Sequence, residues 1–286
     1  MSLKTMSSLQ TDGANKKYAK ATKKINFLAK FAKYLVNNQI DFPIRIIALL
    51  SLMYLLKFPG ADKFFLLQHE DPKTGLYKKG RDDVYFVFTW VVLFTSLRAA
   101  TMKYLLTPIA KLCGIKKNTQ RIRFAEQGWS FLYYSIFWTL GMYVMSKSPY
   151  WFDTTYFWKG YPHIEMSGLF KWYYLVQLAF WIQQVFVINI EKRRKDFVEM
   201  VAHHAITISL IYFSYLMNFT RIGNAVLCTM DFVDLILPAL IYFWFYLICR
   251  VAYRVIKGDN AHDNRSDSEW EETEANTNFA KEIKNE

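Results

Sequence analysis

The chain has 286 residues and a formal net charge of +12, and 53% of its residues are hydrophobic and 18% aromatic. Its charged fraction of 21% lies below the roughly 25% of an average soluble domain, and the charges gather at the ends of the chain and in short bridges between long apolar runs. This pattern excludes an ordinary soluble globule and argues against a nucleic-acid-binding protein, because basic residues beside apolar runs are better explained by membrane orientation and anionic head groups.

The first forty residues form a basic leader with eight lysines and a single acid, Asp12. They contain no apolar run of the kind that a signal peptide needs, so residues 1–41 are predicted to stay in the cytosol. Phe27, Phe31 and Leu35 recur at the spacing of a short amphipathic helix that lies on a membrane surface. A disordered lysine-rich leader is the alternative.

Six apolar runs follow in series, at residues 43–58, 84–110, 128–145, 169–190, 197–217 and 222–256. A helix needs roughly 17 to 25 residues to cross about 30 Å of hydrocarbon, and the first run, with 16 residues, is short. All are predicted to be helices, because an open sheet edge cannot satisfy its backbone groups in lipid. The predicted fold is therefore an all-α, polytopic transmembrane helix bundle of about six spans over residues 42–257.

The bridges between these runs predict the orientation through the positive-inside rule. Residues 111–124 hold five basic residues and no acid, and residues 191–196 pack four basic residues together, so both bridges are predicted to be cytosolic. Acids roughly balance bases at residues 60–83 and 146–168, as expected of lumenal loops. The alternation gives six crossings with both termini in the cytosol.

Residues 258–286 are acidic and carry too little apolar surface to fold alone, so they are predicted to form a disordered cytosolic tail. Ser266 and Ser268 are followed at the third position by Glu269 and Glu271, the acidic context that acidophilic kinases prefer. Both serines are therefore phosphorylation candidates, and each phosphate would add about −1.5 to −2 charge. A tail that only improves solubility is the alternative.

Four titratable side chains form a cluster deep inside the last two apolar runs: His203 and His204 in the fifth, Asp231 and Asp234 in the sixth. The histidines lie roughly 9 to 11 Å from the predicted cytosolic boundary, and the aspartates about 13 to 18 Å from the opposite one, on one helix face. A carboxylate at such depth costs about 2.5 to 3.5 kcal/mol, so these groups are predicted to face a protein interior and to carry function. A histidine supported by a carboxylate is a base that can activate an amine or a hydroxyl. The alternative is that histidine and aspartate satisfy each other and fix packing.

Other groups near the histidines have weaker signals. Glu199 and Thr207, four residues on either side of His203, are either supporting partners on the same face or ordinary helix surface. Adjacent histidines point about 100° apart on a helix, unlike the pair four residues apart of a helical zinc site, so no metal is predicted.

Three cysteines, Cys113, Cys228 and Cys249, are too scattered for a disulfide or zinc framework and are predicted to be free thiols.

This constellation resembles the TLC-domain family and, within it, the fungal-type ceramide synthases. The double histidine is followed by Thr207, a Ser-Tyr pair at 214–215, an Arg-Ile-Gly turn at 221–223 and the D-x-x-D of Asp231 and Asp234. The similarity extends to the WIQQ, EKRRKDF and SLR segments and to the acidic RSDSE tail, and it covers most of the chain from about residue 40.

The resemblance implies a multi-pass enzyme of the endoplasmic reticulum that moves a fatty acyl group from acyl-CoA, its co-substrate, to the amine of a sphingoid base without a cofactor. It makes His203 and His204 the catalytic pair and Asp231 and Asp234 their acidic partners. One histidine would deprotonate the amine or be acylated itself, and both routes stay open. The resemblance also suggests homo- or heterodimers and a small single-span accessory subunit.

The basic bridge offers a second substrate contact. Arg193, Arg194 and Lys195 stand at the predicted cytosolic mouth, where they suit the phosphates of CoA. A plain orientation signal is the alternative for these three residues.

The sequence departs from the family after Asp234. The family continues there with a lysine-containing helix end, a loop and another span, whereas here LILP runs directly into ALIYFWFYLICRVAYRVI. Residues 222–249 are therefore predicted to form one long helix, because about 28 residues rise roughly 42 Å and cannot fold into two spans. An absent span would open one wall of the acyl tunnel and lower activity. The alternatives are an inactive truncated ceramide synthase, a non-catalytic TLC-domain lipid sensor or transfer protein, and a transporter with a proton relay.

Overall fold

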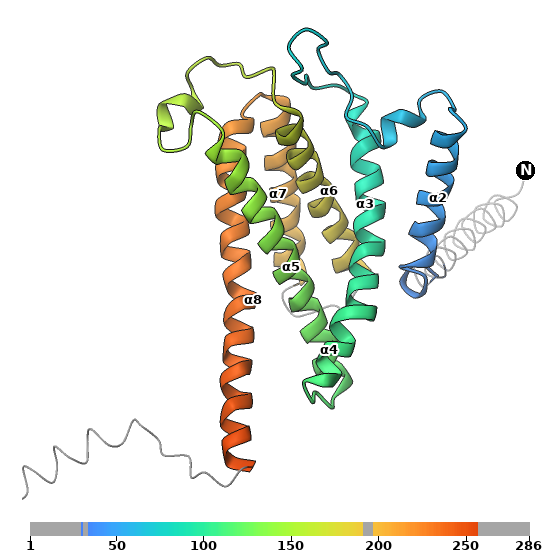
Figure 1. Ribbon diagram of the computed structural model, residues 1–286, viewed down its shortest axis with the longest axis vertical. Coiled ribbons are helices and arrows are strands. Elements are labelled where there is room, and N and C mark those ends of the chain that lie inside the picture. The colour runs from blue at the N-terminus through green and yellow to red at the C-terminus, as the bar shows by residue number, and fades with distance from the viewer. Residues whose placement is uncertain (1–29, 31–33, 191–196, 257–286) are drawn as a thin grey trace, which may run out of the picture. The chain divides into compact units, whose positions relative to one another are not determined.

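The computed structural model describes residue 30, residues 34–190 and residues 197–256 (Figure 1). The leader up to residue 29 and the tail from residue 257 lie outside the described residues, so the predictions for the surface helix, for Ser266 and for Ser268 are not addressed by it. The basic bridge with Arg193, Arg194 and Lys195 also lies outside.

The described residues are helical, with two isolated β-bridges and no strand among them, which confirms the all-α prediction. Each predicted apolar run lies mostly within helical segments. The helices, in chain order, are α2 (Asp41–Leu55), α3 (Asp83–Ala100), α4 (Thr107–Leu112), α5 (Asn118–Ser146), α6 (Gly168–Ile190), α7 (Phe197–Leu216) and α8 (Thr220–Ile256). A π-helical turn, η2 (Thr101–Leu106), joins α3 to α4, and two short 3-10 turns, η1 (Ala61–Phe64) and η3 (Thr154–Phe157), lie in the bridges.

Within the described residues, three helical stretches are long and apolar enough to cross a membrane, at Asp83–Leu112, Phe197–Leu216 and Thr220–Leu240. The chain is a membrane protein on this basis, and the count of six spans stays a prediction. The helix α6 carries Lys171 and three glutamines among many aromatic residues. These polar groups largely face the protein interior, since Lys171, Gln177 and Gln183 are all at most 1% exposed.

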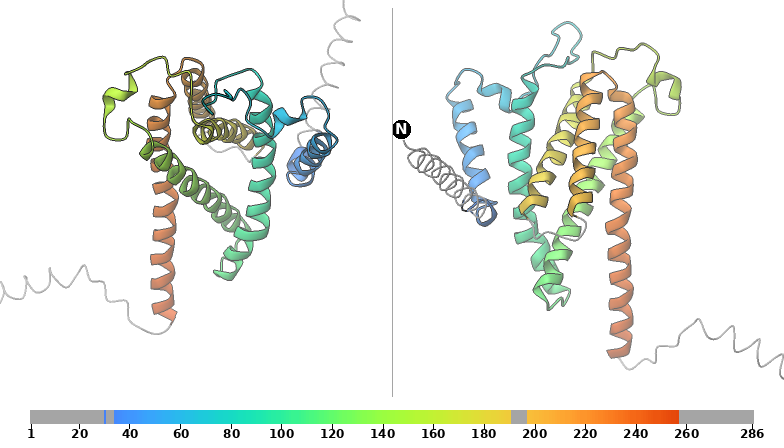
Figure 2. Two further views of the ribbon diagram at one scale, coloured as in Figure 1. Left: turned by 45° about the horizontal axis from the view of Figure 1, so that its top comes forward. Right: turned by 180° about the vertical axis from the view of Figure 1, so that it is seen from behind.

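The helix α6 lies at the centre of the bundle, where it packs against α3, α5 and α7. Figure 2 shows α6 and α7, in yellow and orange, side by side from behind. The core is aromatic: Phe180 of α6 stacks on Tyr133 of α5, with ring centroids 3.4 Å apart, and Phe94 of α3 meets both rings edge-on. Gly141 of α5 permits this packing, because a Cβ there would lie 2.6 Å from the Tyr173 hydroxyl.

A buried ion pair fixes the ends of three helices. The Lys171 ammonium lies 2.7 Å from an Asp83 oxygen, and the Tyr215 hydroxyl donates to the other Asp83 oxygen at 2.7 Å. Lys171 also donates hydrogen bonds to the carbonyls of Gln68 and Lys78. This ion pair and its hydrogen bonds hold the starts of α3 and α6 against the end of α7.

The helix α8 is continuous from Thr220 to Ile256 with Pro238 inside it, which confirms the prediction of one long helix over residues 222–249. The chain divides into two compact units, residues 1–235 and residues 236–286. All four predicted site residues lie in the first unit. Cys113 and Cys228 are free thiols, as predicted, and the side chain of Cys249 lies outside the description.

Candidate active site

The histidine pair projects from α7 beside an indole of α6. The Trp181 ring lies 5.8 Å from the His203 ring and 5.2 Å from the His204 ring, and the two imidazoles are 5.6 Å apart. His204 is buried, whereas His203 is exposed at the surface of the described structure. The two neighbours therefore occupy different environments on one helix.

One hydrogen bond defines the tautomer of His204. Its Nδ1 lies 2.7 Å from the carbonyl oxygen of Met200, one turn earlier in α7. A carbonyl oxygen can only accept, so Nδ1 carries the proton and a neutral ring keeps its lone pair on Nε2. This arrangement leaves Nε2 as the basic atom.

Asp231 lies in the interior with no exposed surface, and one of its oxygens is held by an amide of α6. The Gln177 side-chain N–H donates to Oδ2 of Asp231, while the Gln177 oxygen accepts a hydrogen bond from the Tyr133 hydroxyl at 2.8 Å. Because the hydroxyl donates to the amide oxygen, the NH₂ group must face Asp231. The second carboxylate oxygen, Oδ1, is buried without a hydrogen-bond partner. It is therefore an acceptor that is free to bind a substrate donor.

A buried polar seam continues from Asp231 along two facing helices. Asn224, Cys228 and Asp231 follow one face of α8, and Tyr173 and Gln177 lie one turn apart on α6. Gln177 also contacts the Tyr173 hydroxyl at 3.3 Å, and Asn224 donates to the hydroxyl of a tyrosine beyond α5. Sequence patterns did not identify Gln177, Tyr133 or Tyr173 as part of the site, since a neutral amide inside an aromatic helix changes no charge pattern.

Asp234 is half-buried one turn further along α8. Its carboxylate accepts a hydrogen bond from the Tyr134 hydroxyl, and it interacts electrostatically with His203. Across the part of the chain that the structure describes, no ion pair within 4.0 Å joins a histidine of α7 to either aspartate. Asp234 and His203 thus interact through space and not through a direct ion pair.

The supporting residues differ in their placement. Thr207 is 2% exposed and donates to the carbonyl of His203 at 3.0 Å, so it faces the interior on the turn after the histidine. Glu199 is exposed. Residues 34–190 and 197–256 contain no group of three or more potential metal ligands.

An apolar cavity of about 190 Å³ begins at Thr207 and runs between α6, α7 and α8. Its walls include Ile211, Leu227 and Met230. Gly223 lies in its wall at a close approach, because a Cβ there would collide with the Tyr174 hydroxyl. The cavity offers an apolar chain a place next to the turn that carries the histidines.

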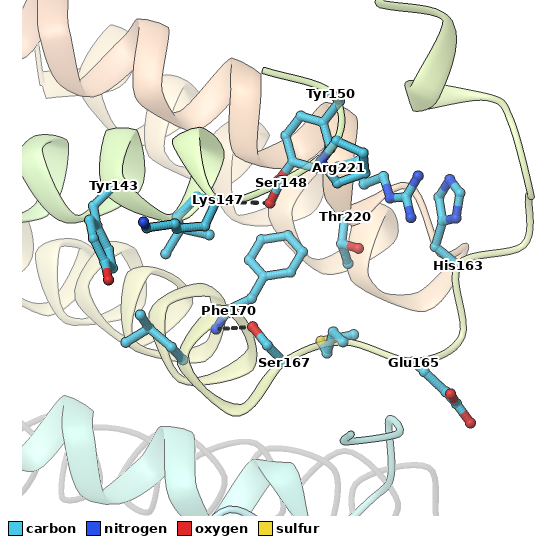
Figure 3. A pocket seen from close by; sticks show the side chains of 14 residues that line it. Tyr143, Lys147, Ser148, Tyr150, His163, Glu165, Ser167, Phe170, Thr220 and Arg221 are labelled. Atoms are coloured by element: carbon cyan, nitrogen blue, oxygen red, sulfur yellow. Dashed lines mark hydrogen bonds between the residues drawn. The ribbon is translucent and has the colours of Figure 1, made fainter. Parts of the chain in front are cut away.

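A second cavity, of about 350 Å³, lies at the far ends of the helices, between the end of α5 and the starts of α6 and α8 (Figure 3). Charged and hydroxyl side chains line it, among them Lys147, Tyr150 and Arg221. Sequence patterns did not identify this cavity, because its lining residues come from three helices and the 147–167 bridge.

The sequence of this chain is similar to a known domain family and to known fungal proteins. A family model described as the TLC domain matches residues 123–243, which include the histidines and the aspartates. The chain is 48% identical over 195 residues to a sphingosine N-acyltransferase-like protein of Alternaria alternata and 44% identical over 198 residues to a ceramide synthase of Gibberella moniliformis. These alignments cover 67% and 68% of this chain but 45% and 46% of the two relatives, so the chain spans about half of their length.

A third relative aligns over more of its own length. The chain is 34% identical to a sphingosine N-acyltransferase of Schizosaccharomyces pombe over 296 positions, which cover 77% of this chain and 76% of that protein. The alignment is longer than the whole chain of 286 residues, so the relative contains residues that have no counterpart here.

Proposed function

The chain belongs to the TLC-domain family of ceramide synthases, and from this premise we propose that it transfers a fatty acyl group from acyl-CoA to the amine of a sphingoid base. The observation that carries the proposal is the buried polar site on α7 and α8, with a basic Nε2 on His204 and a carboxylate oxygen of Asp231 that has no protein partner. A substrate with an ammonium group and neighbouring hydroxyls would supply the missing partners of these atoms.

The proposed reaction needs a base, because an ammonium group has no lone pair with which to attack a thioester. A histidine takes a proton from the ammonium, and the amine then forms a C–N bond with the acyl carbon. The C–S bond breaks, the CoA sulfur leaves as a thiol after taking up a proton, and one net proton is released. In the alternative route a histidine is first acylated and the amine then displaces it.

The two aspartates support this chemistry in different ways. Asp234 interacts electrostatically with His203, and its carboxylate lies on the same helix as Asp231. Asp231 is held by Gln177 with one oxygen free, which suits a contact to the incoming ammonium or to a hydroxyl beside it. The apolar cavity that begins at Thr207 suits the hydrocarbon of a lipid substrate.

We further propose the membrane arrangement that the family membership and the charge pattern support. In it the chain crosses the endoplasmic reticulum membrane six times with both termini in the cytosol. Arg193, Arg194 and Lys195 would then contact the phosphates of CoA from the cytosolic side. Homo- or heterodimers and a small single-span accessory subunit complete this proposal.

A non-catalytic or weakly active ceramide synthase relative is the second candidate. It is favoured by one observation, namely that the Schizosaccharomyces pombe relative carries residues without a counterpart here. If they include a span after Asp234, one side of the substrate tunnel is open to lipid. The chain is then expected to be much less active than a full-length relative although it keeps all four site residues.

The test is incubation of membranes that contain this chain with a sphingoid base and a panel of acyl-CoAs, followed by mass detection of N-acylated product. Membranes from the same host without the chain provide the background. Product above that background, for at least one acyl-CoA, supports the synthase. Product at background level across the whole panel contradicts it and favours the non-catalytic alternative.

A further inference from the structure

The cavity at the bundle end that carries the 147–167 bridge is separate from the histidine site. It is lined by Phe170 at the start of α6, whereas Trp181, the neighbour of both histidines, lies 11 residues further along the same helix. At 1.5 Å per residue this separates the two places by about 16 Å along the helix axis. The cavity therefore belongs to neither the histidine pair nor the two aspartates.

Two cations line this cavity without an acidic partner. Arg221 at the start of α8 and Lys147 at the end of α5 make no ion pair within the described ranges 34–190 and 197–256. Glu165 is the acid of the lining, but Lys78 lies 3.4 Å from it, and in Figure 3 its carboxylate points away from the other side chains. The cavity is left with uncompensated positive charge.

The guanidinium of Arg221 is positioned but not saturated. One of its N–H groups donates to the carbonyl of Tyr156 at 2.8 Å, and its carbon lies 5.9 Å from the centre of the Tyr150 ring. A guanidinium has five N–H donors in a rigid fork, so most of them remain for a ligand. Figure 3 shows this group beside the His163 ring at the rim. Paired oxygens of a phosphate match the fork geometry.

The lining of the cavity combines apolar side chains with hydroxyl groups. Val144, Met166 and Phe170 provide apolar surface, while Ser148 and Thr220 provide hydroxyl groups. Inorganic phosphate would leave the apolar surface without a partner. A phosphate ester that carries a glycerol backbone and the start of an acyl chain would cover it.

The 147–167 bridge holds its shape around this cavity through its own bonds. Burial and the charge of Arg221 lower the pKa of His163 below its usual value, so the ring stays neutral at neutral pH. The Nε2 atom of His163 then donates to the carbonyl of Phe157 at 3.3 Å. The positive charge at the rim consequently rests on the arginine and the lysine.

We propose that this cavity is a binding site for the phosphate group of a membrane phospholipid. Arg221 binds the phosphate through paired N–H groups, and the glycerol end of the lipid packs on Phe170. The exposed side chain of Lys147, whose Nζ lies 5.8 Å from the centre of the Tyr143 ring, turns from that ring toward the bound lipid and neutralises its remaining charge. Such a lipid ties the 147–167 bridge to the start of α8. Phospholipid phosphates lie where membrane helices end, which is the depth expected of a cavity between three helix ends.

The test uses the purified full chain in detergent and measures bound lipid by native mass spectrometry. The probes are phosphatidic acid, diacylglycerol with the same acyl chains, and inorganic phosphate as a competitor. We expect one phosphatidic acid per chain, no retained diacylglycerol, and no displacement by phosphate at equal concentration. Displacement by equimolar phosphate would show an inorganic anion site and would overturn the lipid assignment.

Three variants assign the binding to the cavity. Arg221→Gln and Lys147→Gln are each expected to weaken phosphatidic acid binding about tenfold or more, because each removes a charge-assisted contact. Lys159→Gln removes an equivalent charge from the same bridge but outside the cavity lining, and it is expected to bind like the wild type. Lys147 is exposed at a helix end, so its variant keeps the test decisive even if the Arg221 variant fails to fold. Equal binding by wild type, Lys147→Gln and Lys159→Gln, or no retention by the wild type, would overturn the proposal.

Discussion

Replacing Gln177 with leucine tests how the fold supports the carboxylate of Asp231. Gln177 is fully buried and makes three side-chain hydrogen bonds, to Tyr133, Tyr173 and Asp231. Leucine fills a similar volume but can neither donate nor accept. Asp231 would then have no hydrogen-bond partner on either oxygen, and the Tyr133 hydroxyl would lose its acceptor.

The size of the stability loss in Gln177→Leu follows from the two groups that lose their hydrogen-bond partner, Asp231 and the Tyr133 hydroxyl. A buried polar group without a partner costs about 1 to 3 kcal/mol, so two such groups predict a loss of roughly 2 to 6 kcal/mol in folding stability. If Asp231 turns away from its present position, the activation free energy of the reaction also rises, and each 1.4 kcal/mol of that rise slows the reaction tenfold. We expect kcat for ceramide formation to fall about 10- to 100-fold with a smaller change in KM.

The assay compares kcat, KM and the thermal unfolding midpoint of three variants with those of the wild type. Asn189→Leu removes an exposed amide from the same helix and is expected to behave like the wild type in all three measurements. Tyr133→Phe removes the group that orients the amide while the Gln177 contact to Asp231 remains possible, so an intermediate effect is expected. A Gln177→Leu variant with wild-type kcat and an unchanged midpoint would refute the reasoning.

Four further outcomes are expected. His203→Ala and His204→Ala should each abolish N-acyl transfer at normal protein levels, and wild-type turnover in either variant would exclude that residue as the base. Asp83→Asn should destabilise the fold by about 3 to 5 kcal/mol in equilibrium unfolding, because it leaves the Lys171 charge buried without its partner; a change below 1 kcal/mol would contradict this. Folding lowers the pKa of His163, so as the pH drops the unfolded chain takes up a proton on this histidine at a higher pH than the folded chain does. The folding stability should therefore fall as the pH drops below about 6.5, and it should fall less in His163→Gln. Equal slopes of stability against pH in the wild type and the variant would refute this. Phosphopeptide mapping should find phosphate on the serines of the RSDSE tail, and unmodified serines under all conditions would remove the regulatory interpretation.

The helices were largely predictable, since long apolar runs in a membrane protein have few other ways to satisfy their backbone. The residues at which the helices begin and end were less predictable. The helix predicted from the third apolar run begins at Asn118 rather than near residue 128, because its first turns carry charged residues that lower hydropathy without disfavouring a helix. The junction of α3 and α4 contains a π-helical turn, η2, that no composition signal marks.

The site was predictable where it carries charge and hidden where it does not. His203, His204, Asp231 and Asp234 stand out because ionisable groups are rare in apolar helices. The contact of Gln177 with Asp231 joins residues 54 positions apart, and the Lys171–Asp83 pair joins residues far apart on α6 and α3. Such pairings depend on which helix faces meet, and one sequence does not contain that information.

The most direct test of the central claim is a single-turnover measurement on the purified chain in lipid nanodiscs. Isotope-labelled sphingoid base and acyl-CoA are mixed with an excess of protein, and N-acylated base is quantified by mass against a variant in which both His203 and His204 are alanine. The account predicts labelled product from the wild type, slower than from a full-length relative, and none from the double variant. Product formed equally by the wild type and the double variant, or by neither, would contradict it.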